Sequence, residues 1–261
     1  MRIGFIGLNE VGQTVLNGIL LDGAKAKDIS VCSSSLDVIN SISSAFPGIN
    51  SFISPDQVTS ESDIIVLCST ESNLKEFSSI AVTNCQNKTI ISLISGLSIS
   101  SIQNVFNHSK VLRAVPGVAA SSNIGIVAVA GLNDHIIGAR TVLDTMGKIM
   151  IMSEEQLDQF TAVFSCGLRF ASEIIDAYIK ASEKYFGKNM AEYLTSQSFM
   201  SILSLIDERG LTSEEVIEET KKIKGSEEGM KSFNKEKLID MIKTSMDNSY
   251  EYLTKENKKD Q

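Results

Sequence analysis

The 261-residue chain has no tryptophan, only 3 prolines, 2 histidines and 4 cysteines. The cysteines are scattered without Cys-x-x-Cys spacing, which indicates buried thiols in a reduced, cytoplasmic protein rather than a disulfide framework. No cluster of histidine, cysteine and carboxylate residues has the spacing of metal ligands, so no metal site is expected. His108 and His135 fall in predicted surface connections, and neither is assigned as a catalytic acid.

Long hydrophobic runs are also missing. No apolar stretch approaches the roughly 20 residues that a membrane-spanning helix needs. The first residues, Met1 to Gly7, pass directly into a strand pattern, which leaves no room for the charged and apolar regions of a signal peptide. We therefore expect no export and no membrane partner.

Positive charge is scarce as well, since the formal net charge is -8 and the isoelectric point is about 4.9. This balance disfavours a nucleic-acid partner, because phosphate binding needs clustered lysine and arginine. The one small basic cluster, at residues 221–224, follows two glutamates and is typical of a solvated helix face. An acidic protein can still bind a dinucleotide, because backbone N–H groups at a helix N-terminus hold the pyrophosphate.

Up to residue 152, short apolar runs alternate with amphipathic segments. Several runs are apolar on both faces, which is typical of a mostly parallel sheet covered by helices. The predicted strands are Ile3–Ile6, Ile29–Cys32, Ile64–Cys68, Thr89–Leu93, Lys110–Val115, Ile124–Ala130 and Lys148–Met152. The predicted helices between them are Gly12–Leu21, Ser35–Ala45, Asn73–Val82, Ile99–Phe106 and Asp134–Met146. Residues 1–152 are therefore predicted to form an α/β Rossmann domain.

The pattern changes after Met152, and no convincing strand follows. Ser153 and Gln156 have the spacing of a helix-starting capping box, and Thr212 with Glu215 repeats this signal. The predicted helices are Leu157–Lys184, Met190–Asp207, Ser213–Lys222 and Lys235–Lys255, and the charged tail Thr254–Gln261 is expected to fray. Residues 153–261 are therefore predicted to form an all-helical domain.

A candidate nucleotide loop follows the first predicted strand, where Gly7-Leu8-Asn9-Glu10-Val11-Gly12 takes the place of a G-x-G-x-x-G fingerprint. In that fingerprint the first glycine permits a tight turn, the second lets the backbone approach the pyrophosphate, and the third lets helix and strand pack closely. Asn9 replaces the second glycine. Asparagine tolerates a left-handed conformation, but its side chain can crowd the phosphate. The loop predicts a nicotinamide dinucleotide site, with a loop that no longer binds nucleotide as the alternative. The candidate cofactor-binding residues here are Gly7, Leu8, Asn9, Val11 and Gly12.

The end of the second predicted strand favours NADP over NAD. An acidic residue at this point would bind the free ribose hydroxyls of NAD, but Ser33, Ser34 and Ser35 stand here, with no acid until Asp37. Hydroxyls and exposed amides suit a 2′-phosphate, although no arginine is present to bind it, and NAD stays possible. In the alternative interpretation, Ser35 caps the following helix. Further candidate cofactor-binding residues are Ser69, Thr70 and Gly96.

Four segments carry a resemblance that extends over nearly the whole chain. They are Gly4-Phe5-Ile6-Gly7, Ser92–Leu97 (similar to Ser-x-x-Ala-Gly-Val), Val111–Pro116 (similar to Val-x-Arg-x-Met-Pro), and Met146-Gly147-Lys148 followed by Glu154–Asp158. The family that they resemble is the pyrroline-5-carboxylate reductases. These enzymes of proline biosynthesis reduce a cyclic imine, 1-pyrroline-5-carboxylate, to L-proline with NAD(P)H. The resemblance implies a second, helical domain that interlocks with its twin in a homodimer, with the small imine substrate between the nucleotide and the dimer core.

The sequence departs from this family where the chemistry would lie. After Pro116 the family has Asn-Thr-Pro, whereas Gly117-Val118-Ala119 follows here, so a polar side chain is missing. The family's Ser-Gly-Ser-Gly-Pro-Ala-Tyr segment corresponds to Phe164–Phe170, where only the second glycine is kept. Its Pro-Gly-Gly-Thr-Thr-x-x-Gly loop corresponds to Lys222–Gly229, where charged residues replace the glycine-rich turn.

The resemblance also implies roles at the substrate. Ser226 stands where the family has the threonine that donates a hydrogen bond to the imine, which makes it the candidate catalytic residue. Arg169 and Gly167 are candidate substrate residues, with Arg169 or loop amides holding the substrate carboxylate. Arg169 as an ordinary surface residue of a helix is the alternative. Reduction of a C=N bond needs such donors together with a hydride placed near the carbon.

Other functions stay open beside this one. The chain could reduce another cyclic or open imine. It could also be a non-catalytic paralogue that keeps the nucleotide as a ligand or sensor, which the losses at positions 9, 117 and 222–229 favour. The β-hydroxyacid dehydrogenases share the two-domain plan, but they carry a catalytic lysine where this chain has Ala171, and this disfavours them.

Overall fold

The computed structural model describes residues 1–68, 79–118 and 125–259. The chain forms two compact units, one of Met1–Ser165 with Tyr250–Gln261 and one of Cys166–Ser249. The predicted domain boundary after residue 152 follows the end of the last strand, whereas the contacts between residues divide the chain into its two units after Ser165. The reason is that Leu157 is buried against Ala128 and Ala130 of the sheet, which holds the first helical turns to the first unit.

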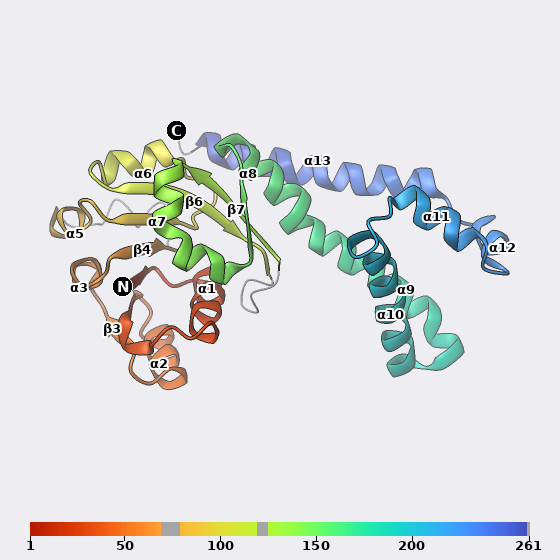
Figure 1. Ribbon diagram of the computed structural model, residues 1–261, viewed down its shortest axis with the longest axis horizontal. Helices are drawn as coiled ribbons and strands as arrows, with labels where there is room; N and C mark the ends of the chain where they lie inside the picture. The colour runs from red at the N-terminus through yellow and green to blue at the C-terminus, as the bar shows by residue number, and fades with distance from the viewer. Residues whose placement is uncertain (69–78, 119–124, 260–261) are drawn as a thin grey trace. The chain divides into compact units, whose positions relative to one another are not determined.

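The first unit is built on one eight-stranded sheet (Figure 1). Its strands are β1 (Ile3–Ile6), β2 (Ile29–Cys32), β3 (Asn50–Phe52), β4 (Ile64–Leu67), β5 (Thr89–Ser92), β6 (Lys110–Pro116), β7 (Ile126–Gly131) and β8 (Lys148–Ile151). They lie in the order β3-β2-β1-β4-β5-β6-β7-β8, and every neighbouring pair is parallel except β6 and β7. The order reverses between β1 and β4, which confirms the predicted Rossmann fold class.

Helices cover both faces of this sheet. Those described are α1 (Glu10–Leu21), α2 (Leu36–Ala45), α3 (Pro55–Glu61), α5 (Ser79–Asn84), α6 (Ile99–Val105), α7 (Asn133–Leu143) and α8 (Glu154–Phe160). Hydrophobic residues of α1, α2 and α7 pack around Phe5 and Val66 on one face. Those of α3 and α6 pack around Ile65 and Ile90 on the other. Because successive strand residues face two different cores, the central strand β4 is apolar at every position.

Some details differ from the prediction. The prediction included neither the edge strand β3 nor the helix α3. β3 has only three residues, all half-buried, and these are too few to show a hydrophobic period. The predicted helix Asn73–Val82 falls mostly outside the described residues, as does residue 124 of the sixth predicted strand. His135 lies within α7 rather than in a surface connection, and its Nδ1 is 3.2 Å from the carbonyl oxygen of Val111.

The second unit is helical, as predicted. Its helices are α9 (Cys166–Phe186), α10 (Lys188–Asp207), α11 (Ser213–Lys221), α12 (Ser226–Met230) and α13 (Lys235–Lys259), the last of which continues into the first unit. Both predicted capping boxes, at Ser153 and Thr212, are present. The expected fraying from Thr254 is wrong, because α13 continues to Lys259 and Lys255 pairs with Glu251 at 3.1 Å. The helix predicted from Leu157 to Lys184 is interrupted by a π-helical turn at Thr161–Ser165.

Three cysteines of the first unit are buried, and their thiols make stability depend on pH. Burial raises the pKa of Cys32 from 9.0 to about 11 and that of Cys85 to about 12, and it also raises the pKa of Cys68. A folded thiol therefore keeps its proton where the unfolded thiol loses it, so the free energy of unfolding falls as pH rises above 9.0. We expect Cys32→Ala to reduce this fall, measured by urea unfolding at about pH 8 and about pH 10.5. An equal fall in both proteins would contradict the assignment.

Candidate functional site

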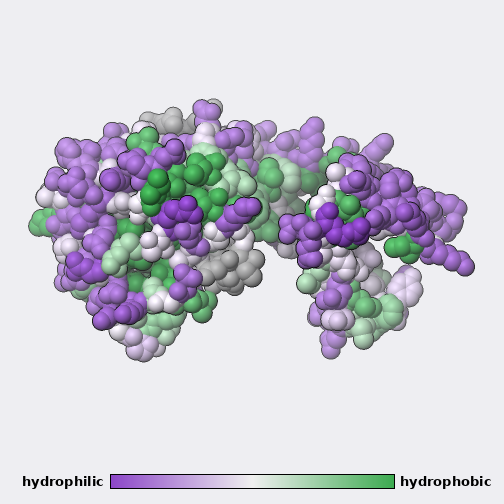
Figure 2. Space-filling model, in the orientation of Figure 1, coloured by the Kyte–Doolittle hydropathy of each residue, from purple (hydrophilic) through white to green (hydrophobic). Residues whose placement is uncertain are grey.

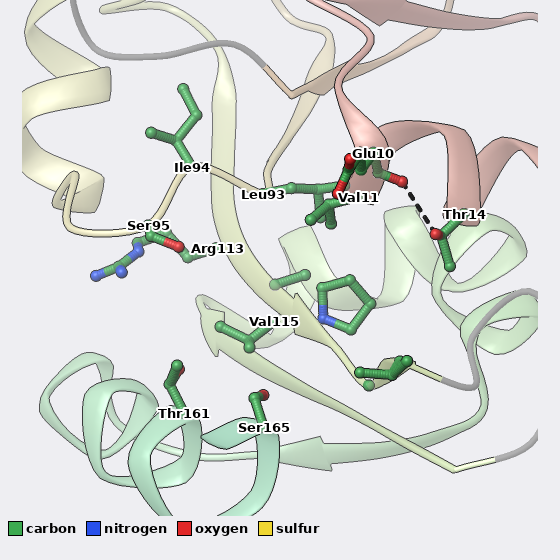
Figure 3. Close-up of a pocket in the computed structure, with 14 residues that line it drawn as sticks. Glu10, Val11, Thr14, Leu93, Ile94, Ser95, Arg113, Val115, Thr161 and Ser165 are labelled. Carbon is green, nitrogen blue, oxygen red and sulfur yellow. Dashed lines mark hydrogen bonds between the residues drawn. The ribbon is translucent and has the colours of Figure 1, made fainter. Parts of the chain in front are cut away.

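A pocket of about 350 Å³ lies in the first unit, beside the start of α1 (Figure 3). Its walls come from α1, from the segment after β5, from the carboxyl end of β6 with the two residues that follow it, and from the π-helical turn. Ligands of open α/β sheets bind at the carboxyl ends of the strands, where the strand order reverses. Because α1 follows β1, which borders the reversal in this sheet, the pocket lies where a dinucleotide is expected.

Gly7 and Gly12 have the backbone properties that the fingerprint requires. Gly7 has a φ of +74°, a turn conformation that favours glycine. A Cβ atom on Gly12 would lie 2.6 Å from Sγ of Cys68, so only glycine lets α1 come this close to the end of β4. Leu8 is buried beneath the loop, and Val11 is exposed at the pocket. The start of α1 therefore fits a pyrophosphate, which binds the unpaired N–H groups of a helix N-terminus.

Asn9 does not use the left-handed conformation that the sequence leaves open to it. Its φ of -86° and ψ of -175° are extended, and its side chain accepts a hydrogen bond from the N–H of Gly12 at 3.0 Å. Asparagine is among the preferred residues for this capping position. The cap occupies one N–H group of the helix start and leaves those of Glu10 and Val11 in the first turn. The acidic Glu10 also lines the pocket.

The serines after β2 are engaged in starting α2. The hydroxyl of Ser33 accepts from the N–H of Ser35 at 3.2 Å, and the hydroxyl of Ser35 accepts from the N–H of Val38 at 3.4 Å. The capping alternative for Ser35 is therefore present in the structure, while Ser34 and Ser35 are exposed. Each hydroxyl still has a proton to donate to a phosphate. Gly96 forms the turn after β5 with a φ of +81°, next to Ser95 of the pocket, and Ser69 and Thr70 lie outside the described residues.

Arg113 lines the pocket and forms an ion pair with Glu154, to which sequence reasoning gave no role. The side chain of Arg113 is 6% exposed, and its Nη1 lies 3.0 Å from Oε1 of Glu154. The same carboxylate oxygen accepts a hydrogen bond from the N–H of Ile99 at 2.7 Å. Glu154 thereby joins α8 to both β6 and α6. Arg113 is visible in the sequence as part of the family-like strand, but its partner is 41 residues away.

Two aromatic rings stack where α8 passes into the π-helical turn, and one of them lies beside Gly117, the residue after β6. Phe160 and Phe164 stack with their centroids 4.9 Å apart. A Cβ atom on Gly117 would lie 3.0 Å from Cε1 of Phe164 and 3.1 Å from the carbonyl oxygen of Ile126. The phenyl ring of Phe164 therefore takes the space into which a side chain at position 117 would extend. A side chain at position 117 would therefore have to exchange with the ring at position 164.

This exchange predicts coupling between the two positions. Gly117→Asn alone should lower the free energy of unfolding by about 1–3 kcal/mol, because the new side chain overpacks the space beside Phe164. Phe164→Ser alone should also destabilise, because it removes a stacked ring. The double variant should lose less than the sum of both, measured by urea unfolding in a double-mutant cycle. Strict additivity would show that the two side chains do not compete for this space.

The other candidate residues belong to the second unit and are not part of the pocket's lining. Gly167 and Arg169 lie in the first turn of α9, and exposed Arg169 pairs with Glu173 one turn later. Ser226 is the first residue of α12, with its hydroxyl 3.3 Å from the carbonyl oxygen of Thr220. Within this unit, the contacts of Arg169 are therefore those of an ordinary surface residue of a helix, which was the alternative interpretation.

In residues 1–68, 79–118 and 125–259, no helix is long and apolar enough to cross a membrane. Within the same residues, no group of three or more His, Cys, Asp or Glu side chains is placed to hold a metal ion.

Comparison with known proteins addresses the class of the protein. Residues 2–96 match the family model described as NADP oxidoreductase coenzyme F420-dependent, and residues 154–255 match the model for pyrroline-5-carboxylate reductase dimerisation. Pyrroline-5-carboxylate reductase 2 of Bacillus subtilis is 25% identical over 84% of this chain and 81% of its own length.

Solved structures agree with this. A pyrroline-5-carboxylate reductase from Coxiella burnetii has a TM-score of 0.82 at 19% identity, over 98% of both chains. The Plasmodium falciparum pyrroline carboxylate reductase, solved with NADP bound, also has a TM-score of 0.82, at 17% identity over 98% of both chains.

These matches show a chain that is similar over most of its length to pyrroline-5-carboxylate reductases, which are oxidoreductases. The matches in both parts of the chain support a divergent member of the pyrroline-5-carboxylate reductase family, in agreement with the resemblance seen in the sequence. The cytoplasmic location and the place in proline biosynthesis stay predictions.

Proposed function

We propose that the protein reduces a cyclic imine with NADPH, and that 1-pyrroline-5-carboxylate is the substrate to test first. The observation that carries this proposal is the pocket, which joins the start of α1 to a space lined by apolar residues such as Leu93, Ile94 and Val115. Such a space suits the aromatic nicotinamide ring of a dinucleotide whose phosphates are held at the start of α1. When bound, the reduced nicotinamide supplies a hydride to the imine carbon.

The preference for NADPH rests on the residues after β2. No carboxylate follows this strand until Asp37, whereas exposed Ser34 and Ser35 offer hydroxyls and backbone amides to a 2′-phosphate. Without an arginine at this point, we expect a moderate preference, with NADPH binding about tenfold more tightly than NADH. NAD remains usable by the same loop.

The substrate roles proposed for the second unit follow the family pattern. Ser226 holds a hydrogen bond at the imine nitrogen, and Arg169, with the backbone near Gly167, balances the substrate carboxylate. Each of the two side chains has a local partner, since the Ser226 hydroxyl faces a carbonyl oxygen and Arg169 pairs with Glu173. Substrate binding would therefore exchange these contacts for new ones.

We further propose a homodimer. The helix α9 has no buried residue, and large hydrophobic side chains are exposed on α9 and α10. Two of them, Phe186 and Met190, lie at the turn between these helices, where Figure 2 shows hydrophobic surface. Exposed apolar area of this extent is typical of an interface. Light scattering should give twice the mass of the 28.4 kDa chain.

The direct test is NADPH oxidation with 1-pyrroline-5-carboxylate, followed by absorbance. Wild type, Ser226→Ala and Ser232→Ala form the set, since Ser232 follows the same short helix and its hydroxyl donates to the carbonyl of Gly229 at 3.0 Å. We expect Ser226→Ala to be about a hundredfold slower and Ser232→Ala to be unchanged. Tight NADPH binding without turnover of any cyclic imine would favour a sensor. Absence of binding would contradict the cofactor.

A further inference from the structure

We propose that the hydroxyl of Ser165 binds the carboxamide group of the nicotinamide ring. The proposal rests on the cofactor assigned above. It concerns a residue to which neither the sequence patterns nor the family resemblance gives a role.

The oxygen of Ser165 is buried and has no hydrogen-bond partner among the residues that the structure describes. Such a group has given up its hydration without compensation, so a partner from outside the chain is expected. Figure 3 shows the side chains of Thr161 and Ser165 pointing from the π-helical turn toward Val115 and the pocket. The same pocket is lined by Val11 of the nucleotide loop.

The π-helical turn explains why this hydroxyl is left without a partner. Serines in the regular helices bond to the carbonyl four residues earlier, as Ser172 does to Leu168 at 2.8 Å and Ser198 to Leu194 at 2.9 Å. Thr161, at the start of the π-helical turn, also bonds in this way. Ser165 ends the turn, where wider backbone bonding displaces the carbonyl that its hydroxyl would use. Turns of this kind are frequent at functional sites.

The chemistry of a carboxamide matches what Ser165 offers. The amide group carries both an acceptor oxygen and N–H donors, and a serine hydroxyl can donate and accept. The apolar walls formed by Leu93 and Val115 suit the ring itself. A hydrogen bond at the carboxamide would fix the rotation of the ring and therefore which face meets the substrate.

The test compares two ligands that differ only in the nicotinamide end. NADPH is titrated by its fluorescence, and 2′-phospho-ADP-ribose, which lacks the ring, by calorimetry. The proteins are wild type, Ser165→Ala and, as control, Ser172→Ala, whose exposed hydroxyl is bonded within α9. We expect Ser165→Ala to bind NADPH about 5- to 20-fold more weakly and 2′-phospho-ADP-ribose within about twofold of wild type. Its melting temperature without ligand should not fall, because the deleted oxygen has no partner in the described residues.

Any other result of the binding and melting measurements would overturn the proposal. Equal NADPH affinity in wild type and Ser165→Ala would show that the hydroxyl does not meet the ring. An equal loss for both ligands, or a lower melting temperature, would show a structural role. Wild type that binds neither ligand would remove the cofactor together with this inference. Binding as expected without imine turnover would leave Ser165 in place and contradict only the proposed reaction.

Discussion

Glu154→Ala is expected to lower the free energy of unfolding by about 3 kcal/mol, the largest effect of any single change considered. The substitution leaves the guanidinium of Arg113 buried without its partner, and it frees the N–H of Ile99. Breaking a buried pair by removing one partner costs about 3–5 kcal/mol. The lower end applies because 33% of the Glu154 side chain is exposed. The melting temperature should fall by about 6–12 °C.

Two further variants decide whether the buried charge is the cause. Glu155→Ala, next to Glu154 in α8 but exposed, should change stability by less than about 0.5 kcal/mol. Glu154→Ala combined with Arg113→Met removes the unpaired buried charge as well and should recover most of the loss, measured by urea unfolding. If Glu154→Ala proved as stable as Glu155→Ala, the pair would contribute nothing. If the double variant recovered nothing, the loss would come from the contact with Ile99.

Much of the first unit could be predicted because its information is local. The strands β1 and β2 have the predicted limits, since their residues are buried on both faces and are mostly apolar. The roles of Gly7 and Gly12 were predictable for a similar reason, because a tight turn and a close helix contact each require glycine itself. Capping boxes depend on residues three apart, and both were found.

The rest of the site depends on contacts that no local pattern shows. The apolar period of the helix after Ser153 continues through Thr161–Ser165, so nothing in it marks the change to π-helical bonding. Gly117 and Phe164 pack against each other although they are 47 residues apart in the sequence (164 minus 117). The partner of Arg113 is set by the way α8 packs on the sheet. Each of these needs the tertiary structure, and together they line the pocket or support its walls.

The second large effect is expected for Gly12→Ala, which should weaken NADPH binding at least about tenfold and lower the free energy of unfolding by about 1–2 kcal/mol. The new Cβ atom would lie 2.6 Å from Sγ and 2.8 Å from Cβ of Cys68, a fully buried residue that cannot move aside easily. Overpacking of this kind costs about 1–3 kcal/mol, which exceeds the gain of at most about 1 kcal/mol from replacing a helical glycine with alanine. Relief requires α1 to move away from β4. That movement shifts the N–H groups of its first turn, on which the pyrophosphate depends.

Gly138→Ala is the matched control, because it also places alanine in a helix of the first unit. Its Cβ atom would meet only Oγ1 of Thr89, at 3.6 Å, so the helix preference should act alone and leave the protein equally or slightly more stable. Adding Cys68→Ala to Gly12→Ala should recover part of the stability, since Sγ is removed while the close Cβ remains. Urea unfolding and an NADPH titration measure both quantities. If Gly12→Ala matched Gly138→Ala in each, close packing of α1 on β4 would not be what holds the nucleotide loop in place.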